Sequence, residues 1–173
     1  MINTFVRKYL KMGIYERVSL LLLIPANALY AIANVTHSWF ELPGVAWYGL
    51  WWAKFCDNIG ECHFVPAFFT NEPAFYHLLQ LLCLLSWAGL ALPIYLLLCD
   101  REFMVLKRNR LHSIAIICVV SAFILNGSLF LFYHMLNNFP REIDKLPKMN
   151  WAGGFAGISC GLQFIAGLLL LQT

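Results

Sequence analysis

Two cysteines that flank a turn are the residues with the clearest potential for chemistry. Cys56 and Cys62 have five residues between them, and residues 57–60 in that interval have turn-forming composition. On the oxidising face of a membrane such a pair can form a structural disulfide. A zinc site would need four ligands, and only His63 lies close by, while a redox-active pair usually has Cys-x-x-Cys spacing. We therefore predict a Cys56–Cys62 disulfide and no metal site.

No other group of residues has the spacing of a catalytic or cofactor-binding site. The sequence lacks the HExxH and GxSxG motifs, clustered carboxylates and a Ser/His/Asp set on one side of a membrane. No full charge lies deep in an apolar segment, which argues against a proton relay or coupled transporter. The net charge of +3 is too small and too scattered to indicate nucleic acid. We expect no enzyme activity, no catalytic residues, no cofactor, no nucleic-acid partner and no small-molecule substrate.

The composition indicates a membrane protein. Of the 173 residues, 61% are hydrophobic and 12% are charged, and the mean hydropathy is +0.69. A soluble fold of this length could not bury so much apolar surface, because a domain of ~150 residues buries only about 70% of what its unfolded chain exposes. Four charge-free stretches each suffice for one crossing of about 20 residues and for no more than one. We predict transmembrane helices at residues 18–36, 74–99, 111–133 and 151–171.

The basic residues predict the orientation of these helices. Eight of the twelve lie before the first helix or in the loop between the second and third. The positive-inside rule then places both termini in the cytoplasm and makes residues 37–73 and 134–150 extracellular loops. No secretory signal peptide is evident, so the first helix is expected to be a retained anchor. We expect residues 1–173 to form one multi-pass domain in the plasma membrane.

Residues 1–17 have a pattern of their own. Apolar residues such as Ile2, Phe5 and Tyr9 recur at helical spacing, with Arg7 and Lys8 off that stripe. This pattern indicates a cytoplasmic amphipathic helix that lies in the inner headgroup layer, with its cations facing anionic lipid. The alternative is that the first transmembrane helix begins early and its first turns protrude.

The first outer loop is unusually rich in aromatic residues, which favours strands over coil. Ten tryptophan, tyrosine and phenylalanine residues lie from position 39 to position 69. The simplest arrangement is a hairpin in which residues 47–56 form one arm and residues 61–69 form the other.

Six residues of this loop form an ordered pattern. Trp39, then Gly49, Leu50 and Trp51, then Cys56 and Cys62 give W…GLW…C…C in the first outer loop of a four-helix protein. This pattern resembles the signature of the claudin, peripheral myelin protein and epithelial membrane protein superfamily. That superfamily includes channel auxiliary subunits of the stargazin type.

The resemblance implies an all-α membrane protein of claudin-like tetraspan type. Its fold would be a four-transmembrane left-handed helix bundle with a small extracellular antiparallel β-sheet, formed mainly by the first outer loop. The disulfide would join two adjacent strands. By the same resemblance, Trp39, Gly49, Leu50 and Trp51 would pack at the outer mouth of the bundle. An indole suits that position because its ring can be half buried there while its N–H remains hydrogen-bonded to water.

Small and polar residues within the helices suggest helix contacts. Gly153, Gly157 and Gly161 recur every four residues and give the fourth helix a flat face. We favour packing of this face inside the bundle over packing against a partner helix. The polar residues expected to hydrogen-bond between helices are Gln80, Asn126, Ser128 and Gln163. Cys99, at the cytoplasmic end of the second helix, is a candidate palmitoylation site, with a passive thiol as the alternative.

Two functions fit these expectations. The first is an accessory subunit that associates laterally with a larger membrane protein, such as an ion channel or receptor. The apolar helix faces, the glycine stripe and the compact loops favour it. The second is a cell–cell adhesion or paracellular barrier protein that associates with itself in the membrane. Its partners in either case are the lipid bilayer and another integral membrane protein or a second copy.

Overall fold

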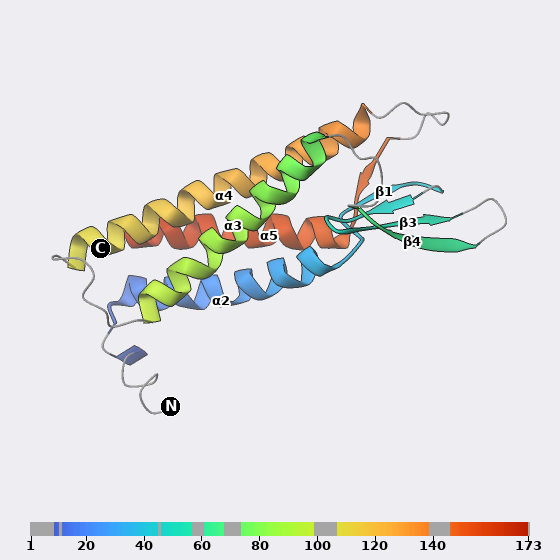
Figure 1. The fold of residues 1–173 in the computed structure, drawn as a ribbon. Helices are drawn as coiled ribbons and strands as arrows, with labels where there is room; N and C mark the ends of the chain where they lie inside the picture. The colour runs from blue at the N-terminus through green and yellow to red at the C-terminus, as the bar shows by residue number, and fades with distance from the viewer. Residues whose placement is uncertain are drawn as a thin grey trace.

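The computed structural model describes residues 9–10, 12–44, 46–56, 61–67, 74–98, 107–138 and 146–172. Its long helices are α2 (Ile14–Val35), α3 (Ala74–Leu98), α4 (Lys107–Asn137) and α5 (Trp151–Leu171). They form one elongated bundle in which α2 and α4 each pack against α3 and α5 (Figure 1). Each helix is long and apolar enough to cross a membrane, which confirms the prediction of four such segments.

Two helices are longer than the sequence predicted. Helix α2 begins at Ile14 instead of residue 18, and α4 covers Lys107–Asn137 instead of residues 111–133. The prediction located apolar stretches, whereas backbone hydrogen bonding continues through the polar residues at their ends. Arg17 illustrates how such a residue is accommodated, because its side chain donates to the carbonyls of Met12 and Leu10, just before α2, at 2.9 and 2.6 Å. The predicted amphipathic segment falls mostly outside the described residues.

A small antiparallel sheet lies at one end of the bundle (Figure 1). Its strands, β1 (Phe40–Leu42), β2 (Ala46–Tyr48), β3 (Trp52–Cys56), β4 (Cys62–Pro66) and β5 (Lys148–Met149), lie in the order β4-β3-β2-β1-β5. Four of them come from the first predicted outer loop and β5 comes from the second. Helix α2 begins and α5 ends at the opposite end of the bundle.

The predicted hairpin is correct in one arm and wrong in the other. Strands β3 and β4 pair as a hairpin with Cys56 directly opposite Cys62, and the two cysteines form the predicted disulfide. The other arm, residues 47–56, is two antiparallel strands with a turn at residues 49–51. The prediction failed because the turn carries no proline or Asn-Gly signal, and its carbonyls are satisfied by side chains from a distant helix.

The helices are joined by hydrogen bonds from small polar side chains to carbonyls of neighbouring helices. Ser19 Oγ donates to Ala166 O at 3.0 Å, and Ser159 Oγ donates to Ala26 O at 2.8 Å, so α2 and α5 are linked in both directions. Each of these hydroxyls is buried. Such bonds satisfy polar groups that would otherwise be unpaired in an apolar bundle.

The longer polar side chains follow the prediction unevenly. Gln163 Nε2 donates to Gly89 O at 3.2 Å, which joins α5 to α3 as expected. Gln80 instead donates to Leu50 O in the outer loop. The side chain of Asn126 is exposed and has no hydrogen-bond partner among the described residues, so the predicted bond from Asn126 to another helix of the same chain is wrong.

Removal of the disulfide tests how much it stabilises the sheet. We expect Cys56→Ser to lower the free energy of unfolding by about 2–3 kcal/mol, because the bridge closes a short loop in the unfolded chain. The measurement is denaturant unfolding of the purified protein in detergent. The matched control is Glu61→Ala, which changes an exposed residue of the same hairpin outside the bridge. Equal stability of Cys56→Ser and wild type would contradict this role.

Candidate functional site

Trp39 lies at the junction between the bundle and the sheet, where it is fully buried and not half buried as expected. Its indole Nε1–H donates to the Ala33 carbonyl near the end of α2 at 2.6 Å. Its ring packs against the rings of Tyr30 on α2 and Phe132 on α4, with centroid distances of 6.3 and 6.2 Å. A buried indole N–H needs such an acceptor. Trp39 therefore fixes the direction in which the chain leaves α2 and enters β1.

The backbone of Trp39 hydrogen-bonds to β2 on one side and to the residue before α5 on the other. Its N–H donates to Tyr48 O in β2 at 3.0 Å, and its carbonyl accepts from Asn150 N, directly before α5, at 2.9 Å. Gly153 in the first turn of α5 packs against the same carbonyl, because a Cβ added there would lie 2.6 Å from the oxygen. The missing side chain lets α5 come close to the sheet.

The turn between β2 and β3 is held by two side chains of α3. The Tyr76 hydroxyl donates to the carbonyls of Gly49 and Leu50, at 2.6 and 3.2 Å, and Gln80 Nε2 donates to Leu50 O at 2.8 Å. Position 49 requires glycine, because an added Cβ would lie 2.2 Å from the Thr36 carbonyl oxygen. The turn is thus pressed against the end of α2 and tied to α3.

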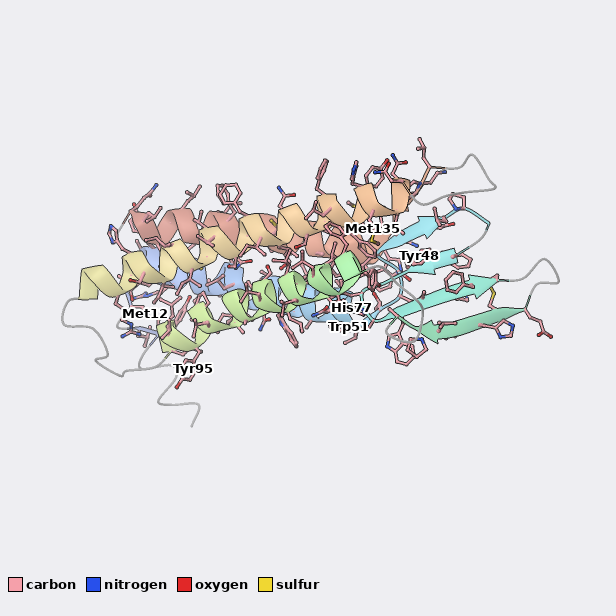
Figure 2. All side chains as sticks on the ribbon, turned by 45° about the horizontal axis from the view of Figure 1, so that its top comes forward. Met12, Tyr48, Trp51, His77, Tyr95 and Met135 are labelled. Atoms are coloured by element: carbon pink, nitrogen blue, oxygen red, sulfur yellow. A yellow bond between two sulfur atoms is a disulfide. The ribbon has the colours of Figure 1, made fainter. Side chains whose placement is uncertain are left out.

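The rest of the Gly-Leu-Trp sequence lies at the same junction. Leu50 is fully buried. Trp51 is half-buried, and its Nε1–H donates to Asn34 Oδ1 on α2 at 3.3 Å. Figure 2 shows Trp51 with Tyr48 and His77 where the helices meet the sheet. The structure therefore brings together the four residues that the resemblance singled out.

The sequence analysis did not identify Tyr76 and Phe132 as residues of the junction. It assigned Gln80 to a bond between helices instead of to the turn between β2 and β3. Tyr76 and Gln80 are four residues apart in the first turns of α3, so they share a face. That spacing of two hydrogen-bonding side chains on an apolar helix was a usable signal. Phe132 had no local signal, because its contacts with Trp39, Phe40 and Tyr76 come from distant parts of the chain.

One face of the sheet carries a row of charged and aromatic side chains. In register across all five strands these are Lys148, Glu41, Trp47, Lys54 and Phe64, which we call the cation–aromatic row. The ammonium of Lys54 lies 5.2 Å from the ring centroid of Trp47 and 5.5 Å from that of Phe64, within the range of cation–π attraction. Phe64 is 56% exposed. The opposite face includes Phe40, which packs on Phe132.

His37 borders the cation–aromatic row. Its ring meets the Phe64 ring edge-on, with a centroid distance of 5.1 Å. Partial burial and the positive charge of Lys54 both lower the pKa of His37 below its usual value of 6.5. Both causes disfavour the charged imidazolium. His37 is therefore neutral at physiological pH and becomes positively charged only in acid.

The glycines of α5 divide between two environments. Gly153 packs against the Trp39 carbonyl, and Gly167 packs against α4, since a Cβ there would lie 2.9 Å from Val119. Gly157 and Gly161 are exposed, and no heavy atom lies within 4 Å of a Cβ added at either. The interpretation that the whole stripe packs inside the bundle is therefore wrong for these two residues. The face they share is open to a neighbour.

The remaining predicted site, Cys99, lies outside the described residues. Within the described part of the chain, no group of three or more His, Cys, Asp or Glu side chains could hold a metal ion. The geometry instead provides a five-stranded sheet fixed to four apolar helices, with one mixed aromatic and charged face.

Substitution of Gly49 tests the close contact at the junction. We expect Gly49→Ala to destabilise the protein by about 1–3 kcal/mol, because the methyl group would force apart two backbone segments. Gly154→Ala is the matched control, since no atom lies within 4 Å of its added Cβ. In a helix interior that change should stabilise by ~0.5–1 kcal/mol. Unfolding in detergent measures both, and the same effect from the two variants would refute the contact.

Titration of His37 tests the electrostatics of the row. Because the folded state binds the proton less readily than the unfolded state, His37 should lower stability as pH falls below 6.5 and contribute nothing above it. The measurement is the imidazole NMR shift of His37 against pH in bicelles. Lys54→Met should raise the midpoint toward the ordinary value. A wild-type midpoint at or above 6.5 would contradict the assignment.

The candidate site is thus the cation–aromatic row and the junction that supports it, built from residues 37–66, the start of α3 and the start of α5. No protein-family model and no curated protein sequence matches the chain.

Proposed function

We propose that this chain is a claudin-like tetraspan protein of the plasma membrane that acts as an accessory subunit. It associates laterally with a larger membrane protein, such as an ion channel or receptor, and carries out no catalysis. In this proposal the bundle is left-handed, the sheet lies outside the cell, and both termini are cytoplasmic. The observation that carries the proposal is the cation–aromatic row on the sheet.

The composition of the row suits protein contact. Aromatic residues are enriched in the cores of protein interfaces, where they bury large areas with few rotatable bonds. Trp47 and Lys54 are half-buried and Phe64 is exposed, so each already has a restricted position and still offers surface. Because the sheet is fixed by the disulfide and by Trp39, little entropy is lost when a partner binds.

The position of the row supports a lateral partner. The sheet continues the long axis of the bundle, so a neighbour beside the chain could contact helices and sheet together (Figure 1). Helix α3 presents exposed Leu81, Leu85 and Tyr95 along its outer side. Apolar helix faces of this kind associate by close packing within lipid.

The alternative function is adhesion or a paracellular barrier. Strand β4 is at one edge of the sheet, and His63 and Phe64 on it are exposed. An edge strand can pair with the edge of another molecule through its backbone. This edge favours contact between copies on opposed or neighbouring membranes.

Affinity purification from native membranes tests the proposal. We expect wild type to bring down one channel or receptor in stoichiometric amount. Lys54→Glu and Phe64→Ser should each lower the recovery about tenfold, as expected for loss of an interface hot spot of about 1–2 kcal/mol. Glu61→Ala is the matched control, because Glu61 is also exposed and lies on the same hairpin. Surface expression of each variant is measured in parallel.

The outcomes separate the two functions. If no stoichiometric partner is recovered and the protein alone forms strands at contacts between transfected cells, the adhesion function replaces the accessory one. If a partner is recovered equally well with Lys54→Glu and Phe64→Ser, the row is not the contact surface and the accessory function loses its main support.

A further inference from the structure

Apart from those near the two ends of α4, five amide side chains lie within the described apolar helices, and four of them hydrogen-bond inside the chain. Asn27 and Asn34 accept from the indoles of Trp87 and Trp51, while Gln80 and Gln163 donate to the carbonyls of Leu50 and Gly89. The fifth, Asn126 on α4, is exposed, and its side chain has no hydrogen-bond partner among the residues that the structure describes. Gln163 leaves its Oε1 unpaired, but Asn126 differs from the other four in that its side chain makes no hydrogen bond at all within the described residues.

Asn126 lies well inside the candidate membrane span of α4. The apolar segment of α4 extends from Arg110 to Asn137, and Asn126 is eleven residues from the nearer end. At 1.5 Å per residue this distance is about 16 Å. An amide without a hydrogen-bond partner in hydrocarbon carries a large desolvation penalty. Its partner must therefore come from another molecule in the membrane.

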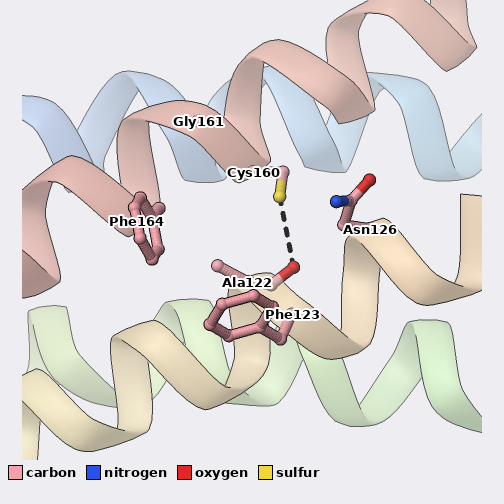
Figure 3. Close-up of a pocket in the computed structure, with 6 residues that line it drawn as sticks. All are labelled: Ala122, Phe123, Asn126, Cys160, Gly161 and Phe164. Atoms are coloured by element: carbon pink, nitrogen blue, oxygen red, sulfur yellow. Dashed lines mark hydrogen bonds between the residues drawn. The ribbon is translucent and has the colours of Figure 1, made fainter.

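The surface around Asn126 is shaped for close approach. A groove of about 220 Å³ lies between α4 and α5 (Figure 3). Its lining residues are Ala122, Phe123, Asn126, Cys160, Gly161 and Phe164. Gly127 beside it on α4, and Gly157 and Gly161 on α5, have no heavy atom within 4 Å of an added Cβ. Small residues at a helix surface allow backbones of neighbouring helices to come together.

We propose that this α4–α5 face is the interface of a homodimer, in which the Asn126 carboxamides of two copies hydrogen-bond to each other. A carboxamide has both donors and acceptors, so two related by a two-fold axis satisfy each other. Two copies inserted in the same direction also place Asn126 at the same depth, which a partner of different sequence would have to match independently. The inference rests on the helices spanning a membrane and does not depend on the accessory function.

The experiment measures association of the labelled full-length chain in phosphatidylcholine vesicles, by energy transfer as lipid dilutes the protein. We expect wild type to dimerise and Asn126→Leu to raise the dissociation constant about tenfold, since two interhelical hydrogen bonds are lost. Asn126→Gln keeps the donors and acceptors and should retain most of the association. Asn27→Leu is the matched control, because that amide is already used by Trp87, and it should dimerise as wild type does.

A second variant tests the same α4–α5 face and leaves Asn126 unchanged. Gly161→Leu should also weaken association, because its side chain would occupy the groove, and it should fold normally since the position is open. Monomeric wild type at every lipid ratio would overturn the proposal, as would equal dimerisation of Asn126→Leu and wild type. A monomer whose Asn126 is instead needed to bind a different membrane protein also overturns it.

Discussion

The hydrogen bond of the buried Trp39 indole to the Ala33 carbonyl is the constraint on which the outer half of the molecule depends. A buried indole N–H must find an acceptor, and the carbonyls in the last turn of a helix remain open to side-chain donors. Ala33 O also accepts from the Thr36 N–H and hydroxyl, so it is shared at the end of α2. Because the indole bond fixes the chain as it leaves α2, it also fixes where β1 begins and where the sheet lies. The two tightest glycines of the junction, Gly49 and Gly153, then follow, since both allow backbones to meet beside this bond.

A second constraint extends along the bundle. Unpaired polar groups between apolar helices are costly, and the chain pairs most of them through small polar side chains that donate to single carbonyls. Ser19 and Ser159 link α2 and α5 reciprocally, and Gln163 reaches α3 from α5. The same requirement applies to Asn126, because the other four amides within the described apolar helices each form a hydrogen bond inside the chain, whereas the Asn126 side chain forms none. Satisfaction of polar groups thus accounts for both the packing of the bundle and its proposed contact with a second copy.

Much of the fold could be predicted because the signals were local. Four apolar stretches gave four helices, and two cysteines on either side of a turn gave the disulfide. The errors arose where a neighbour distant in sequence decided the outcome. Residues 47–56 were predicted as one strand, but Tyr76 and Gln80 from α3 hold a turn in the middle. The glycine spacing of α5 marked one face correctly but could not say that Gly157 and Gly161 face outward.

The sequence by itself determined the number of apolar helices, the position of the β3–β4 turn and the pairing of Cys56 with Cys62. These depend on hydrophobic length and on contacts between residues close along the chain. Only the tertiary structure decided the order of the strands, the cation–aromatic row and the open α4–α5 face. A side chain such as Phe64 or Asn126 has the same local sequence whether it is covered or exposed. Which of the two it becomes depends on how distant segments fill the space around it.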